Sequence, residues 1–124
     1  MYDRDLAIEI LNQVNHAIDI ITQRFKPIKR PEHFTNSPSG MEKLDAICMQ
    51  LIVIGESLKN FEKITNKAIL KRYPDIEWKK VIGLRDVITH HYFDINAYAI
   101  FDICESKLDP LKKAIENILD DMNC

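Results

Sequence analysis

The chain has 124 residues, a length that fits one domain around one hydrophobic core and excludes a second domain of ordinary size. Hydrophobic residues make up 46% and charged residues 29%, which is typical of a globular protein and excludes a disordered one. The formal net charge of −2 argues against a protein that coats long stretches of nucleic acid, but not against a local basic pocket that grips a few nucleotides.

Apolar residues recur with helical spacing along almost the whole chain, and the first predicted helix covers about residues 3–25. Pro27 and Pro31 stop this helix and bracket a loop. The basic residues of the loop are Lys26, Lys29 and Arg30.

The second predicted helix follows a polar stretch, and the segment from Ser39 to Glu42 is its expected capping box. Its apolar face consists of Leu44, Cys48, Leu51, Ile54, Leu58 and Phe61. Gly55 falls on the same face. Because a glycine costs about 1 kcal/mol in a helix interior, its position predicts a close approach of another helix. A tolerated glycine of no consequence is the alternative.

The remaining helices follow in short succession. Thr65 is predicted to cap a short helix that ends near Arg72, and Asp109 followed by Pro110 is a helix-start signal. The other expected helices cover about residues 76–91, 97–106 and 109–122. The pattern predicts an all-α, up-and-down bundle of four main helices plus one short helix, in a single domain over residues 1–124.

Targeting and cysteine signals are sparse. No apolar run is long enough to cross a bilayer and no export signal is visible, so a cytoplasmic protein without membrane association is expected. Cys48, Cys104 and Cys124 are odd in number and widely spaced, which favours reduced thiols, two of them near the core. No Cys or His pair has metal-ligand spacing, so neither a metal nor a cofactor is expected.

The third long helix contains one anomaly. Arg85 falls in the middle of an apolar stripe that runs from Trp78 to Tyr92. A guanidinium there must be paired or must face a cavity or a partner. His90 follows five residues later, and Asp86, one turn before it, could hold the imidazole through its ring N–H.

Arg85 and His90 suit the cleavage of RNA without a metal. A histidine can take a proton from the ribose 2′-hydroxyl or give one to the leaving 5′-oxygen. An arginine can neutralise the charge on the transition state, and a 2′,3′-cyclic phosphate and a 5′-hydroxyl are the expected products. Five residues correspond to about 140° of helix rotation, so one chain makes a poor site, whereas two chains across a two-fold axis could complete it.

Plainer interpretations of the same residues remain open. Arg85 could form a structural salt bridge, for example with Glu56. His90 and His91 could bond free carbonyls at the helix end, and Tyr92 could be an ordinary core aromatic.

The segment from Gly83 to Tyr92 resembles the signature of HEPN domains, which is an arginine, four to six residues and a histidine. More narrowly, Arg85-x4-His90-x-Tyr92 is similar to the form found in HepT-like toxins of prokaryotic toxin–antitoxin pairs. Ile54-Gly55-Glu56-Ser57 resembles an Ile-Gly-Glu-Ala segment of that family, and Trp78 resembles the tryptophan at the start of its motif helix. Asp86 stands where the family often has asparagine. The resemblance covers nearly the whole chain.

The resemblance implies a HEPN-type bundle that works as a homodimeric ribonuclease toxin, with Arg85 and His90 of both protomers in one cleft and a tRNA or an mRNA as substrate. It also implies a partner, a minimal nucleotidyltransferase antitoxin of the MntA-like kind that transfers AMP from ATP to Tyr92. AMP there would place bulk and negative charge beside Arg85 and His90. The alternatives are a non-catalytic HEPN module that binds a nucleotidyltransferase or a nucleotide, and a plain helical dimerisation protein.

Overall fold

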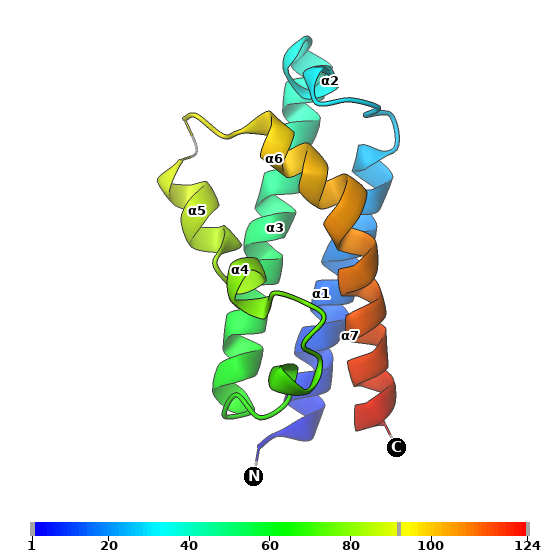
Figure 1. Cartoon of the computed structure of the whole chain (residues 1–124), viewed down its shortest axis with the longest axis vertical. Coiled ribbons are helices and arrows are strands. Elements are labelled where there is room, and N and C mark those ends of the chain that lie inside the picture. The colour runs from blue at the N-terminus through cyan, green and yellow to red at the C-terminus, as the bar shows by residue number, and fades with distance from the viewer. Residues whose placement is uncertain (1, 92, 124) are drawn as a thin grey trace.

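The computed structural model describes residues 2–91 and 93–123, and all regular structure in this part of the chain is helical (Figure 1). The elements are α1 (Arg4–Phe25), α2 (Glu32–Thr35), α3 (Pro38–Ile64), the 3₁₀ turn η1 (Leu70–Arg72), α4 (Trp78–Ile82), α5 (Leu84–His90), α6 (Ala97–Asp102), the π-helical segment η2 (Ile103–Lys107) and α7 (Leu108–Met122). The predicted all-α bundle is therefore confirmed.

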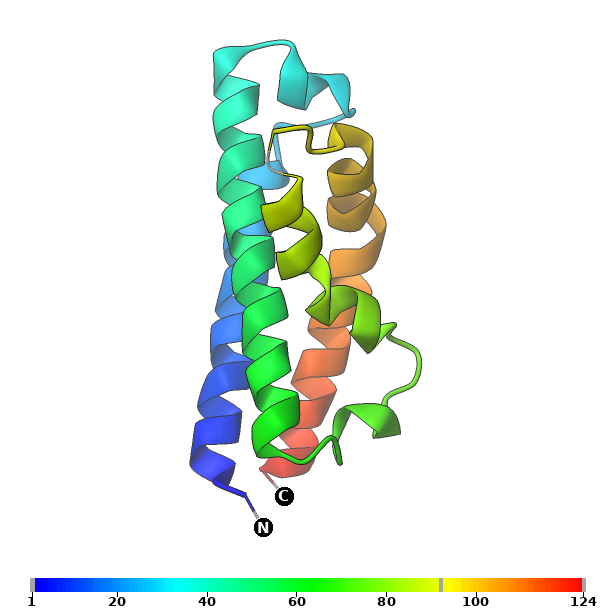
Figure 2. The ribbon, with the colours of Figure 1, turned by 90° about the vertical axis from the view of Figure 1, so that its left-hand side faces the viewer.

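Helix α3 is central to the bundle, because α1, α2, α4, α5 and α6 all contact it. Helix α1 lies along one side of α3 and also packs against α7. Helices α4 and α5 lie along another side of α3, and Figure 2 shows α5 beside it. The short helix α2 lies at the end of the bundle opposite the two termini (Figure 1).

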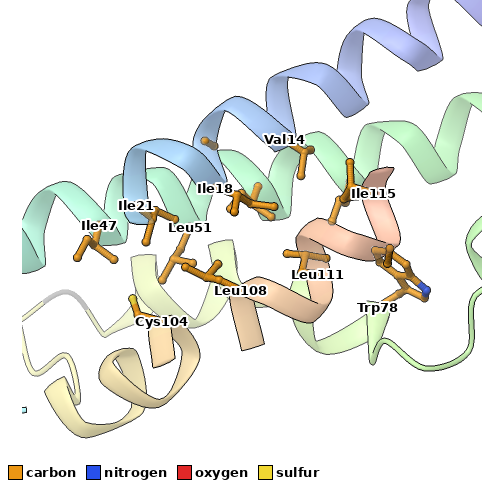
Figure 3. Close-up of a cluster of buried hydrophobic side chains, with 14 of the residues drawn as sticks. Val14, Ile18, Ile21, Ile47, Leu51, Trp78, Cys104, Leu108, Leu111 and Ile115 are labelled. Atoms are coloured by element: carbon orange, nitrogen blue, oxygen red, sulfur yellow. The ribbon is translucent and has the colours of Figure 1, made fainter. Parts of the chain in front are cut away.

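The core lies where α1, α3 and the C-terminal helix meet, with Trp78 of α4 at its edge (Figure 3). The predicted apolar face of the second helix is confirmed, since all six of its residues are buried. Each fully buried aliphatic side chain contributes about 1.5–3 kcal/mol relative to an exposed one. The indole Nε1 of Trp78 donates to the carbonyl of Tyr73 at 2.9 Å, so burial of the ring leaves no unpaired donor.

The start of α3 lies earlier than expected. Ser37 is the N-cap, and its hydroxyl accepts a hydrogen bond from the amide of Gly40 at 3.0 Å. Pro38 occupies the first turn, where its fixed φ is favourable and its missing N–H costs nothing. The prediction of a capping box that begins at Ser39 is wrong, and the Ser39 hydroxyl instead accepts from Lys43 Nζ at 3.0 Å.

Gly55 lies at a close contact between α3 and the junction of α4 and α5. A Cβ atom at this position would lie 3.1 Å from the carbonyl oxygen of Ile82 and 3.2 Å from both the carbonyl oxygen of Val81 and the amide nitrogen of Arg85. These distances are shorter than ordinary van der Waals contact. The predicted close helix approach at Gly55 is confirmed.

The long helix predicted over residues 76–91 is two helices. Gly83 interrupts it with φ −72° and ψ −10°, a turn-like ψ that ends α4 and begins α5. Glycine is a weak helix former, so the helix breaks at Gly83 while α4 and α5 each pack against α3.

Thr65 does not begin a helix. Its hydroxyl donates to the carbonyl of Phe61 at 2.7 Å, so it closes α3. Asn66 and Lys67 follow with φ of 54° and 59°, a left-handed conformation that no right-handed helix can contain. The predicted short helix is therefore reduced to η1.

The predicted break before Asp109 is also wrong. Helix α6, η2 and α7 follow one another without a gap, and α7 begins at Leu108. Pro110 lacks an N–H and its ring would clash with a carbonyl four residues earlier in an ideal helix. The π-helical segment accommodates it, with the Leu108 amide bonded to the carbonyl of Ile103, five residues earlier.

The predicted positions of two thiols are confirmed, because Cys48 and Cys104 are free and buried. Burial raises the pKa of Cys48 to about 11 and that of Cys104 to about 12, so both stay protonated at neutral pH. Cys124 lies outside the described residues. Within those residues, no helix is long and apolar enough to span a membrane, and no three His, Cys, Asp or Glu side chains are grouped to hold a metal ion.

We expect Gly55→Ala to lower the free energy of unfolding. Crowding against three backbone atoms costs about 1–3 kcal/mol, which exceeds or offsets the gain in helix propensity of about 1 kcal/mol. Chemical denaturation measures the change. Asn60→Ala, at an exposed position of the same helix, should be neutral or stabilising, and a rise in stability for Gly55→Ala as well would contradict the close contact.

Candidate active site

Arg85 lies at the edge of the apolar stripe rather than within it. The side chain is 48% exposed, with Nε 3.5 Å from Glu56 Oε2 and Nη1 3.1 Å from Asp86 Oδ1. On the stripe itself, Trp78 and Ile88 are buried. The guanidinium is thus held between carboxylates of α3 and α5 while one side remains open to solvent.

Asp86 contacts Arg85, its immediate neighbour. Residues 2–91 and 93–123 show no hydrogen bond between Asp86 and His90, the pairing that the one-turn spacing suggested. Both side chains can turn either way on an exposed helix surface, and in this structure the aspartate pairs with the nearer and permanently charged group.

His90 is the last residue of α5 and is exposed to solvent. Just before it, the hydroxyl of Thr89 donates to the carbonyl of Arg85 at 2.8 Å. His91 caps the helix, and its Nδ1 lies 3.6 Å from Oδ1 of Asp94. Within the described part of the chain, Arg85 and His90 make no hydrogen bond with each other. Tyr92, the predicted AMP acceptor, lies outside the described residues.

Two consecutive residues of α3 position Arg85. Gly55 lets the backbone of α3 approach the amide of Arg85, and Glu56 reaches its guanidinium. The Glu56 ion pair, left open by the sequence as a structural alternative, is present. The Glu56 side chain is 49% exposed, so the pair lies at the surface and not in the core.

Val87 is a residue of this surface that the sequence pattern did not single out. It lies on α5 between Arg85 and His90 and is 58% exposed. The sequence could have indicated Val87 because it is an apolar residue of the predicted helix that does not fall on the apolar stripe. A single exposed aliphatic side chain is common on protein surfaces, so Val87 alone does not identify an interface.

Arg85 and His90 lie outside the main cavity of the described residues. A cavity of about 370 Å³ lies between α3, α4, η2 and α7, with a mostly apolar lining. Leu84, next to Arg85 in the chain, contributes to this lining, but Arg85 and His90 do not. The chemistry of Arg85 and His90 is therefore presented on an open helix surface.

Comparisons with known proteins agree on one family. A family model described as "Ribonuclease HepT-like" matches residues 14–118. "Putative RNase MJ0125" of Methanocaldococcus jannaschii is 31% identical over 122 residues, which cover 98% of this chain and 97% of that protein. "Putative RNase MJ0127" of the same organism is 39% identical over 77 residues, 62% of this chain and 60% of that protein. "Putative RNase TTE0752" of Caldanaerobacter subterraneus is 30% identical over 109 residues, which cover 88% and 90%. No solved structure matches significantly.

We expect Glu56→Gln to change the free energy of unfolding by less than about 1 kcal/mol, because half-exposed ion pairs are weak and screened by salt. Urea denaturation at low and high salt measures this. Glu62→Gln on the same helix removes a carboxylate that forms no ion pair among the described residues, and it is the matched control. A loss of several kcal/mol for Glu56→Gln alone would assign the pair a structural role.

Proposed function

The chain belongs to the HepT-like family of HEPN-type ribonucleases, and we propose from this premise that it is an endoribonuclease that uses Arg85 and His90. The observation that carries the proposal is the exposed surface of α5. A half-exposed arginine and an exposed histidine lie on one short helix, so each side chain is accessible to a phosphate. Glu56 and Asp86 limit the freedom of the guanidinium, so less conformational entropy is lost when it binds a phosphate.

The proposed reaction needs no metal. The ribose 2′-oxygen attacks the adjacent phosphorus while a neutral imidazole of His90 takes its proton. A bond forms between the 2′-oxygen and phosphorus, the bond to the 5′-oxygen breaks, and an imidazolium gives that oxygen a proton. Arg85 stabilises the added negative charge on the phosphoryl oxygens. The products are a 2′,3′-cyclic phosphate and a 5′-hydroxyl.

Two protomers supply the two histidines in this proposal. One imidazole cannot be base and acid in the same step, whereas a two-fold axis through the α5 surface brings two copies of His90 and Arg85 together. The exposed Val87 supports this arrangement, because it would give such a contact an apolar centre.

The proposed regulation of the ribonuclease by an antitoxin rests on the family resemblance. We place the protein in a toxin–antitoxin pair of the cytoplasm, with a minimal nucleotidyltransferase of the MntA-like kind as antitoxin and a tRNA or mRNA as target. Transfer of AMP to Tyr92 would put a phosphodiester two residues from His90, where its charge competes with RNA for Arg85.

A non-catalytic HEPN module that binds a nucleotidyltransferase or a nucleotide is the second candidate. The contacts of Arg85 favour it, because two carboxylates already surround the guanidinium. Their negative charge weakens its attraction for phosphate.

We expect His90→Ala to abolish growth arrest and RNA fragmentation in cells in which the wild-type chain causes both. Loss of a general acid or base slows a reaction by about 10²–10⁴-fold. Growth curves and total RNA on a gel measure the effect. His91→Ala is the matched control, because it removes a neighbouring exposed imidazole that pairs with Asp94 and should leave toxicity intact. A fully toxic His90→Ala protein would overturn the catalytic role, whereas an inert wild-type protein would favour the binding module.

We expect Tyr92→Phe to leave a toxin that its antitoxin cannot silence by modification, since phenylalanine has no hydroxyl to accept AMP. Co-expression with a minimal nucleotidyltransferase of the MntA-like kind, followed by intact-mass analysis, measures both silencing and the mass of an added AMP. If the Tyr92→Phe protein still carries AMP at another residue, Tyr92 is not the sole acceptor.

A further inference from the structure

The loop between α1 and α2 concentrates positive charge in an otherwise acidic chain. Four cations fall within residues 24–30, and no acidic residue lies between Asp19 and Glu32. We use the name basic loop for Lys26, Lys29 and Arg30, all of them exposed. In the described part of the chain, Lys26 and Lys29 form no ion pair, while Arg30 Nε lies 3.3 Å from His33 Nε2. Cations without carboxylate partners are available to bind an anion.

The basic loop is held in place by its own backbone. Ile28 is buried, and its amide donates to the carbonyl of Phe25 at 2.9 Å. The amide of Lys29 donates to Nδ1 of His33 at 3.0 Å. Phe34, fully buried at this end of the bundle, packs against Phe25 with ring centroids 6.3 Å apart. The cations are therefore presented from an anchored segment, which lowers the entropic cost of binding.

The basic loop and the end of α5 lie at the same end of the bundle, as both views show (Figures 1 and 2). Between them, Tyr98 of α6 donates its hydroxyl to Glu32 of α2 at 3.0 Å, so these two helices are joined. Tyr98 is 63% exposed, and Phe93, in the segment that follows α5, is 87% exposed. One exposed ring, Tyr98, is thus bonded to the helix that follows the basic loop, and the other, Phe93, comes three residues after His90 in the chain.

We propose that this end of the bundle binds the single-stranded RNA that flanks the cleavage site, with bases on Phe93 and Tyr98 and phosphates on the basic loop. Single-stranded nucleic acid is bound by aromatic rings together with cations, because every base has a face that stacks and every linkage carries a charge. Two acids lie nearby and each has a partner, since Glu32 accepts a hydrogen bond from the Tyr98 hydroxyl and Asp94 Oδ1 lies 3.6 Å from His91 Nδ1. The choice of RNA as the ligand rests on the proposed ribonuclease function.

The role of the lysines is tested with a mixed-sequence 12-nucleotide 2′-O-methyl RNA. Its affinity for the full chain is measured at several salt concentrations. We expect Lys26→Gln/Lys29→Gln to bind more weakly and to reduce the slope of log affinity against log salt by about 1.4, or about 0.7 for each phosphate that is no longer neutralised. Lys67→Gln/Lys71→Gln, which removes two exposed cations beyond the far end of α3, is the matched control and should bind like the wild type.

Variants of Tyr98 test the proposed stacking of bases on the aromatic rings. We expect Tyr98→Ala to bind the same oligonucleotide about tenfold more weakly, whereas Tyr98→Phe keeps a ring for stacking and retains the affinity. Equal losses for both variants would point to the bond with Glu32 and overturn stacking on Tyr98. A circular dichroism melt of each variant establishes that it is folded.

Cleavage of a ribodinucleotide, too short to reach the basic loop, separates the two proposals. If the wild type cleaves it and the two double-lysine variants bind the 12-mer alike, the RNA-binding surface is overturned while the ribonuclease function stands. If the wild type cleaves no RNA but binding depends on Lys26 and Lys29, the surface is supported and the ribonuclease function fails. A wild-type protein that does not bind the 12-mer overturns the surface directly.

Discussion

The contact between Gly55 and the junction of α4 and α5 is the constraint on which the candidate site depends. It leaves room for a hydrogen atom but not, without displacement, for a methyl group. Helix α5 has seven residues and one buried side chain, Ile88, so its own helix propensity cannot fix its position. Helix α3 is long and packed against α1 along its buried face, and it supplies the rigidity that α5 lacks. The backbone of Arg85 is therefore placed by a glycine of another helix, and its guanidinium by the next residue, Glu56.

This arrangement separates what holds α5 from what α5 presents. Ile88 is its buried side chain and Arg85 pairs with Glu56 of α3 while staying half exposed, whereas Val87 and His90 are exposed to solvent. A short helix with so little buried area opens locally more readily than the core does. In the proposed function, a second protomer on this surface would cover Val87, fix α5 from its outer side and complete the histidine pair in one event. Dimerisation and assembly of the site would then be the same step.

The sequence predicts what depends on periodicity and fails where one local signal competes with packing. The buried face of α3 and the role of Gly55 follow from residues that recur along one side of a helix. The break at Gly83 does not, because a glycine inside a helical pattern is as compatible with continuation as with a turn. Asp109 followed by Pro110 has the pattern of a helix start, yet the helix continues because a π-helical segment just before the proline accommodates it. The partner of Asp86 is a choice between neighbours on an exposed surface, which spacing cannot decide.

Charge is the last feature that connects the site to the rest of the molecule. Glu56 and Asp86 orient the guanidinium of Arg85, but their charges together exceed its own, so the immediate surroundings of Arg85 attract phosphate poorly. An enzyme of net charge −2 that acts on RNA must therefore obtain its attraction elsewhere. The basic loop is a group of cations at the same end of the bundle as the end of α5, and it takes no part in those two ion pairs. In the proposed function, the basic loop supplies long-range attraction and the two carboxylates orient Arg85, so the carboxylates would not prevent the binding of RNA.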